Sequence, residues 1–291
     1  MDRILFGDNQ FFGINHMSEE KSREQSLRFK DAKAMIAVLD IAYDLGLRTF
    51  MCTTHDRIAE ICDHIRANSQ RYQGFEIYPC MPYAHKYANA VTEHGIIGAI
   101  KNVMPDNLLS AVAKGGVATV KKDFLKLMEL LIDAEMKMFR GIDTPVIFLQ
   151  NVVTDLLLGL GIKDVFVAFT EYIQKAFNAE AGFITMNMIK LLDVFEECGI
   201  RNPIICSSIN KIGFRMSGGN QAYERAIGER QFRPIAMQVL AAGAIPPAEA
   251  LEYVCKLDGV KAILFGASTK DHIQETKELI EKFSLEHGQL H

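Results

Sequence analysis

Val260-Lys-Ala-Ile-Leu-Phe-Gly-Ala-Ser-Thr-Lys-Asp-His-Ile-Gln-Glu-Thr276 is the stretch that decides the fold. Its apolar run at 262–265 is typical of a buried β-strand, and the residues that follow the turn have the spacing of an amphipathic helix. The Gly-Ala-Ser-Thr turn between them directs unpaired backbone N–H groups at one point, which favours phosphate or another anion. The sequence therefore predicts a phosphate- or cofactor-binding turn made of Gly266, Ala267, Ser268, Thr269 and Lys270.

The same order of strand and helix recurs upstream of this stretch. Short apolar runs occupy residues 3–12, 48–53, 75–80, 145–150, 182–187, 203–208 and 234–240. Continuous apolar strands separated by helical patterns are typical of a parallel sheet that helices cover. Eight such units predict an α/β fold of the (β/α)8 TIM barrel type. A doubly wound open sheet is the alternative, which the lack of a GxGxxG or P-loop motif after the first strand disfavours.

We expect one domain over residues 1–291. Residues 84–143 are longer than one crossover needs, and we interpret them as a helical elaboration of the third strand–helix unit, with helical patterns at 88–103, 106–113 and 122–139. The polar residues 14–30 predict a loop or lid-like segment. Asp31 and Asp56 stand where they can cap the helices that precede and follow the second strand.

The composition is that of a globular protein, with 49% hydrophobic and 23% charged residues. A net charge of −4 with interspersed signs gives no footprint for nucleic acid. The sequence has no signal-peptide pattern and no apolar run of transmembrane length, so we expect no membrane partner. Six scattered cysteines without a CxxC pair suggest reduced thiols and a cytoplasmic location. The sequence leaves the oligomeric state open.

Barrel active sites lie at the carboxyl ends of the strands, where each apolar run turns polar. Here that ring of residues is rich in amides and hydroxyls and poor in carboxylates. Such side chains offer both donors and acceptors, as a sugar or sugar phosphate requires. The predicted partner is a small anionic substrate, and the predicted substrate-binding residues are Asn9, Gln10, Gln150, Asn187, Ser207, Asn210 and Gln238.

Three residues of this ring are candidates for proton transfer or imine chemistry. Asp8 ends a buried strand, where desolvation would raise the pKa of its carboxyl; a plain turn residue is the alternative. His55 would act as acid or base near neutral pH, or cap a helix. Lys211 would form a Schiff base with a carbonyl substrate if desolvated, and would otherwise bind phosphate or face water.

Cys52 beside His55 is a candidate nucleophile, and a buried structural thiol is the alternative. The same pair together with Cys80 and His85 has ligand types that zinc accepts. These four residues are spread over two strand–helix units and lack a second closely spaced pair, so we predict no metal site.

Three segments resemble the aldo-keto reductase superfamily. Residues 34–50 resemble that family's "A…D.G.r.fDTA" segment, residues 182–187 resemble its "GxSN" strand, and residues 260–276 resemble its "viPGAsspehieeN" cofactor segment. The resemblance implies a barrel. It also implies that the last segment holds the phosphate and adenine end of NADP.

The catalytic positions of that family differ here. Cys52 stands where the family has its catalytic Asp, and Arg57 stands where it has Tyr. Cys80 or Met81 replaces the family's Lys, and Gln150 replaces its His. Met237 or Gln238 replaces the aromatic residue that stacks on nicotinamide. We therefore expect that the family's proton relay does not operate.

Three functions remain open. The first is a non-redox enzyme of lyase, aldolase or isomerase type that acts on a phosphorylated or sugar-like carbonyl compound, as in sugar metabolism. The second is a divergent NAD(P)H-dependent reductase, with NADP as the candidate cofactor. The third is a barrel that binds a small molecule without catalysis.

Overall fold

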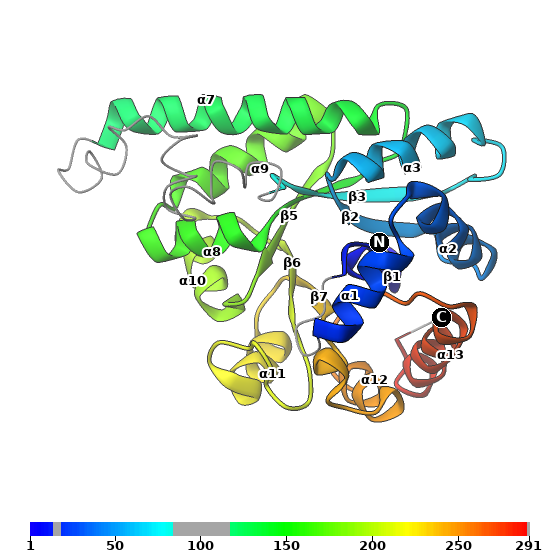
Figure 1. Cartoon of the computed structure of the whole chain (residues 1–291). Helices are drawn as coiled ribbons and strands as arrows, with labels where there is room; N and C mark the ends of the chain where they lie inside the picture. The colour runs from blue at the N-terminus through cyan, green and yellow to red at the C-terminus, as the bar shows by residue number, and fades with distance from the viewer. Residues whose placement is uncertain (14–18, 84–116, 290–291) are drawn as a thin grey trace.

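The chain forms a closed barrel of eight parallel strands with helices outside it (Figure 1). The computed structural model describes residues 1–13, 19–83 and 117–289. The strands are β1 (Ile4–Gly7), β2 (Thr49–Thr53), β3 (Glu76–Met81), β4 (Val146–Leu149), β5 (Glu180–Thr185), β6 (Ile204–Ser208), β7 (Arg233–Met237) and β8 (Ala262–Phe265). They pair in chain order, and β1 pairs with β8. The predicted (β/α)8 TIM barrel is confirmed.

Helices follow the strands on the outer face of the barrel. They are α1 (Glu19–Arg28), α2 (Ala32–Asp44), α3 (Asp56–Ala67), α7 (Val117–Met136), α8 (Asn151–Leu160), α9 (Asp164–Phe177), α10 (Met188–Cys198), α11 (Gly219–Glu229), α12 (Pro247–Cys255) and α13 (Lys270–Glu286). Short 3-10 helices are η1 (Asn9–Phe12), η3 (Lys137–Phe139) and η4 (Ala241–Gly243). Within the described residues, no helix is long and apolar enough to cross a membrane.

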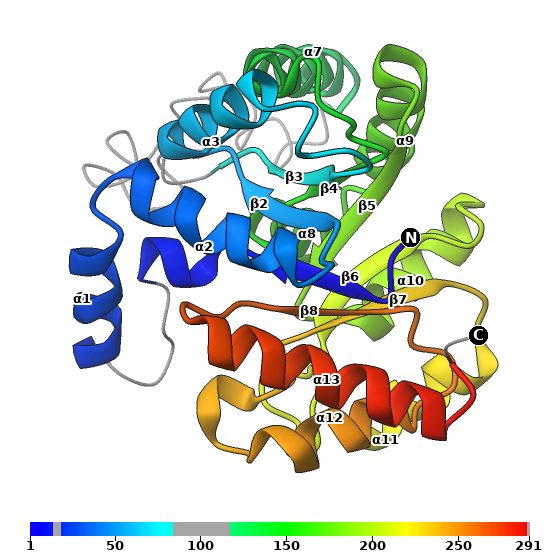
Figure 2. The ribbon, with the colours of Figure 1, turned by 90° about the vertical axis from the view of Figure 1, so that its right-hand side faces the viewer.

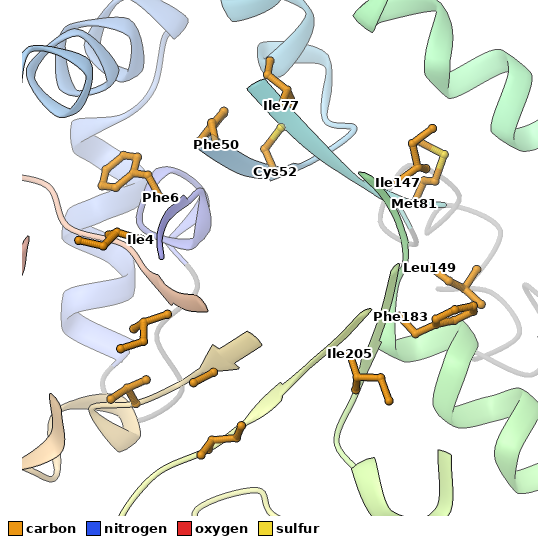
Figure 3. Packing of buried hydrophobic residues seen from close by; sticks show 14 of the residues in the cluster. Ile4, Phe6, Phe50, Cys52, Ile77, Met81, Ile147, Leu149, Phe183 and Ile205 are labelled. Atoms are coloured by element: carbon orange, nitrogen blue, oxygen red, sulfur yellow. The ribbon is translucent and has the colours of Figure 1, made fainter. Parts of the chain in front are cut away.

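Strand pleating divides the core into two layers. Side chains such as Leu5, Tyr78 and Phe148 fill the inside of the barrel. Their sequence neighbours point outward and pack under the helices, as Figure 3 shows for Phe6, Phe50, Cys52, Ile77 and Ile147 among others. Gly182 on β5 leaves room for an interior ring, because a Cβ there would lie 2.4 Å from Cε1 of Phe148.

Arg3 ties the two ends of the barrel together. Its guanidinium donates to the backbone oxygen of Val260 and to the side chain of Gln289, and its Nε donates to Oγ of Ser284 at 3.0 Å. The first strand and the last helix are therefore joined by one side chain as well as by the β1–β8 ladder.

Several predicted boundaries need correction. The first strand ends at Gly7, and the polar-aromatic run after it forms η1 instead of continuing the strand. Much of the predicted loop at 14–30 is helix α1. The residue that caps α3 is His55, one position before the predicted Asp56, whereas Asp31 caps α2 as predicted. The helical pattern at 122–139 belongs to α7 and η3, while those at 88–103 and 106–113 lie outside the described residues.

Candidate active site

Asp8 occupies the carboxyl end of β1 and is 6% exposed. Its Oδ2 accepts hydrogen bonds from the backbone N–H and from Oγ1 of Thr53, both at 2.8 Å. Burial raises the pKa of the Asp8 carboxyl, and these two donors oppose part of that rise. The charge of Asp8 in turn raises the pKa values of Cys80 and Tyr83, after the larger effect of burial. The predicted strand-end carboxyl therefore lies next to the ends of β2 and β3.

Glu135 is a second buried carboxylate, at 2% exposure, and it comes from α7. It accepts a hydrogen bond from Oγ1 of Thr54 at 2.5 Å and from the backbone N–H of Tyr83 at 3.2 Å. Because Thr54 follows Thr53, the two carboxylates hold neighbouring residues at the end of β2. We call Asp8, Thr53, Thr54, Glu135 and Tyr83 the mouth network.

His55 is the N-cap of α3, with Nδ1 accepting from the backbone N–H of Arg57 at 3.1 Å. A neutral ring that accepts at Nδ1 carries its proton on Nε2. The ring centroid lies 4.6 Å from that of Phe12 and 5.7 Å from that of Tyr83. The predicted histidine is thus a helix cap that also borders the mouth network.

Cys52 does not lie with these residues. It is 1% exposed. It belongs to the outer layer between sheet and helices, and Figure 3 shows its side chain among the residues of that layer. Burial raises the pKa of its thiol well above the ordinary value, so the thiol stays protonated. This position suits the structural alternative and gives the predicted nucleophile no support. Of the four residues with ligand types that zinc accepts, His85 lies outside the described residues. Among the described residues, no group of three or more His, Cys, Asp or Glu side chains is arranged to hold a metal ion.

Lys211 lies in the exposed loop after β6 and forms an ion pair with Glu249, with Nζ 2.6 Å from Oε1. Its side chain is 47% exposed. A Schiff-base lysine needs a desolvated amine, and a solvated ion pair does not provide that environment. The structure therefore places Lys211 in the solvent-facing alternative.

The amides at the ends of β4 and β7 are half-buried at the barrel mouth. Gln150 is the N-cap of α8 and follows β4 directly. Gln238 follows β7 with a φ of 54°, in the left-handed region, and its Oε1 accepts from Oγ of Ser208 at 2.6 Å. Both predicted substrate-binding amides therefore stand at strand ends, as expected.

Other predicted substrate-binding residues have structural partners. Ser207 is fully buried and its hydroxyl donates to the backbone oxygen of Thr185 at 2.8 Å. Asn210 is also fully buried, and both ends of its amide bind the backbone of Phe214. Asn187 caps α10 by accepting from the backbone N–H of Lys190. Asn9 is an exposed residue of η1. The predicted substrate-binding residues thus include some at the barrel mouth and others that stabilise loops.

Among the described residues, the predicted anion turn between β8 and α13 and the neighbouring helix η1 have buried polar atoms without hydrogen-bond partners. Oγ of Ser268 is one, and Oε1 of Gln10 is another. A Cβ at Gly266 would lie 2.0 Å from that Gln10 oxygen, so the glycine lets the Gln10 side chain approach the turn closely. Gln10, predicted to bind substrate, is 4% exposed, and its Nε2 donates to the backbone oxygen of Gly7.

Cationic side chains stand beside this turn. Thr269 caps α13 by accepting from the backbone N–H of His272, and the exposed Lys270 begins the helix. Arg28 of α1 donates to the backbone oxygen of Ser268 at 2.7 Å. Figure 2 shows α1 on the same side of the barrel as the end of β8 and the start of α13. The helix N-terminus, the unpartnered hydroxyl and two cations fit a phosphate group.

Comparison with known proteins gives a structural likeness and no match in sequence. No family model and no curated protein matches the chain. A putative aldo-keto reductase from Pseudomonas aeruginosa has a TM-score of 0.59 at 11% identity, over 97% of this chain and 91% of that chain. An aldo-keto reductase from a Medee basin deep-sea metagenome library has a TM-score of 0.55 at 9% identity, over 100% and 93%.

A putative 2,5-diketo-D-gluconic acid reductase B has a TM-score of 0.55 at 12% identity, over 99% of this chain and 87% of that chain. The barrel resembles that of the aldo-keto reductases. At such low identities the likeness concerns the fold. These comparisons do not test the expected differences at the family's catalytic positions, which therefore remain a prediction.

Proposed function

We propose that the chain is an enzyme that transfers a proton to a small anionic carbonyl substrate at the carboxyl end of the barrel. The observation that carries the proposal is the mouth network. It holds the nearly buried carboxyl of Asp8 within electrostatic range of Tyr83, and the buried carboxylate of Glu135 fixes the Tyr83 backbone. Buried titratable groups with shifted pKa values are typical of sites that move protons.

Tyr83 and Asp8 have complementary parts in this chemistry. The pKa of Tyr83 is raised, so its hydroxyl stays protonated at neutral pH and is a hydrogen-bond donor for a carbonyl oxygen. Asp8, whose own pKa is raised, either donates a proton or accepts one as the substrate's charge changes. In a reduction, the carbonyl carbon gains a hydride, the carbonyl oxygen gains this proton, and an alcohol results.

The preferred form of the proposal is an NAD(P)H-dependent reductase. The residues that would hold a dinucleotide phosphate are Ser268, Lys270 and Arg28 around the N-terminus of α13. When bound, the reduced dinucleotide supplies the hydride. The neighbours named as aldo-keto reductases support this form over a non-redox one.

A non-redox isomerase or lyase is the second candidate. It is favoured by the end of β7, where Met237 and Gln238 offer no aromatic ring to stack on nicotinamide. The same mouth network would then move a proton between carbon and oxygen of a sugar-like carbonyl compound. The exposure of Lys211 argues against an imine-forming aldolase.

Two measurements test the proposal. If the reductase form is right, NADPH at millimolar concentration raises the melting temperature, and Ser268→Ala with Arg28→Ala reduces that rise, since a ligand of the folded state stabilises it. No rise with NADPH or NADH removes the reductase form. Exchange of deuterium from D2O into carbonyl substrates then tests the second candidate. If no reduction and no Asp8-dependent exchange occurs, the barrel only binds its ligand, and the proposal fails.

A further inference from the structure

An open groove of about 460 Å³ lies at the carboxyl ends of β4, β5 and β6, away from the β8–α13 turn. Its lining consists of Asn151, Met186, Gly213, Arg215, Met216 and Ser217. A smaller cavity of about 250 Å³ adjoins it and shares Met186 and Ser217. We call the larger one the Arg215 groove.

The loop that forms one wall of the groove is held rigidly by two asparagines. The amide of Asn210 accepts from the backbone N–H of Phe214 and donates to its backbone oxygen, both at 2.8 Å. Nδ2 of Asn220 donates to the backbone oxygen of Asn210 at 2.8 Å and to that of Lys211 at 3.1 Å. Because both ends of the loop are tied down, the groove wall is formed before any ligand arrives.

Arg215 is held by this loop in a conformation that a non-glycine residue rarely adopts, with a φ of 55°. Backbone strain of this kind persists where the surrounding structure enforces it, commonly at ligand sites. The guanidinium forms no ion pair with any carboxylate of the described residues; its recorded contact is with the Phe214 ring, 5.4 Å from the centroid. Lys211, which lies in the same loop, is by contrast paired with Glu249.

The charge and polarity of the groove suit an anion. Asn151 and Ser217 add neutral donors to the Arg215 cation. Among the described residues that line the two cavities, the one carboxylate is that of Asp155, which lines the smaller cavity and accepts from Oγ1 of Thr185 and from the backbone N–H of Met186. Lys190 lines that second cavity too. A planar guanidinium is well matched to the oxygens of a carboxylate or phosphate.

We propose that the Arg215 groove binds the anionic oxygen group, carboxylate or phosphate, of the substrate, and that Arg215 determines specificity for it. The link to a substrate rests on the proposed function, whereas anion binding in the groove stands by itself. Because Asn151 and Met186 closely follow β4 and β5, a ligand seated there would lie at the carboxyl end of the barrel.

The test is a titration of the 15N-labelled full chain with malonate and, separately, with inorganic phosphate, followed by NMR. We expect the amide resonances of Gly213, Arg215 and Ser217 to move in the wild type. Arg215→Gln should weaken binding at least tenfold, and Arg215→Gly should do the same while relieving the backbone strain. The matched control is Arg225→Gln on α11, which removes one exposed positive charge outside the groove and should leave binding unchanged.

Tighter binding of malonate would indicate that the groove binds a carboxylate, and tighter binding of phosphate would indicate a phosphoryl group. Either result supports the site if Arg215→Gln weakens the binding. The inference is overturned if neither anion moves these resonances, or if Arg225→Gln weakens binding as much as Arg215→Gln. No turnover or dinucleotide is used in this experiment. Failure of the proposed reaction would therefore leave its result intact, and the reverse also holds.

Discussion

Thr53 donates twice to the same carboxylate oxygen of Asp8, once through its backbone N–H and once through Oγ1, each at 2.8 Å. One residue of β2 thereby fixes the side chain that ends β1. The arrangement keeps a nearly buried carboxyl in one orientation. It also explains why burial, although it raises the pKa of Asp8, meets an opposing effect.

Removing the hydroxyl of Thr53 should cost stability. Thr53→Val deletes one of the two donors to the buried Asp8 carboxyl, and a buried acceptor left without its donor costs about 1–3 kcal/mol. We expect a loss of that size in the free energy of unfolding, measured by urea denaturation at pH 7. Thr53→Ser keeps the hydroxyl and is the control. A valine variant as stable as the serine variant would contradict the role of this hydroxyl.

Asp8 should make stability depend on pH in a defined direction. Burial raises the pKa of Asp8 above its ordinary value of 3.8, so the folded chain keeps this proton at pH values where the unfolded chain has lost it. The contribution of Asp8 to stability therefore falls as pH rises from 3.8 through the folded-state pKa, by about 1.4 kcal/mol for each unit of the shift.

Asp8→Asn removes this titration. As pH rises through that window, the unfolding free energy of wild type should fall relative to that of Asp8→Asn. Above the window, the difference between the two should no longer change with pH. Urea denaturation at several pH values measures it, and other titrating groups such as Asp155 cancel in the difference. A difference that does not vary with pH would disprove the assigned shift.

Glu135→Gln should destabilise the chain by about 1–3 kcal/mol, because the Tyr83 N–H donates to both carboxylate oxygens and an amide would place its NH2 group, which cannot accept, opposite that N–H. Glu129→Gln on the same helix is the matched control, with an expected change within about 0.5 kcal/mol. Thermal and urea unfolding of both variants provide the comparison. If both variants lost the same unfolding free energy, the loss would come from removing a negative charge from α7, and the hydrogen bonds of Glu135 in the mouth network would contribute nothing.

Gly266→Ala should destabilise the chain by about 1–3 kcal/mol, because the new methyl group would meet Oε1 of Gln10. Gln10→Ala in the same chain should recover most of that loss, and a double-mutant cycle measures the coupling. Gly159→Ala is the control, since nothing lies within 4 Å of its Cβ position, and it should raise stability by up to about 1 kcal/mol. Additive effects at positions 10 and 266 would refute the contact.

Lys211→Met should change little. An exposed ion pair such as that between Lys211 and Glu249 contributes about 1 kcal/mol or less to stability. We expect activity on any substrate found to be retained and no borohydride-trapped adduct on Lys211 in the wild type. A trapped adduct identified by mass spectrometry would restore the imine mechanism.

The barrel was predictable because its signal is local. Each apolar run followed by a helical pattern is legible over about ten residues, and the turn that ends in the Thr269 cap was assigned correctly. The place of Asp8 at the end of a buried strand was predictable too, since a carboxylate directly after an apolar run stands out, and its catalytic part stays a prediction. The direction in which a strand side chain points could not be predicted. Because β2 is buried on both faces, its sequence does not indicate that Cys52 points outward from the barrel.

Glu135 was missed for a different reason. It lies 81 residues after Thr54 and 52 after Tyr83, in a helical pattern where a glutamate is ordinarily solvent-exposed. No sequence motif pointed to Arg215 either. The proposal for Arg215 depends on its backbone conformation and on the lack of an ion pair with any carboxylate of the described residues, and neither is visible in the sequence. Contacts between distant segments, and charges left unbalanced by folding, are properties of the assembled barrel.

The unpartnered oxygen of Gln10 has a thermodynamic consequence for any ligand at the β8–α13 turn. Folding has already removed the water from this acceptor, so its desolvation is part of the cost of folding. A ligand donor that reaches it would form a hydrogen bond without displacing water from the protein side. The same atom that lowers the stability of the free chain would thus add to the affinity of the bound one.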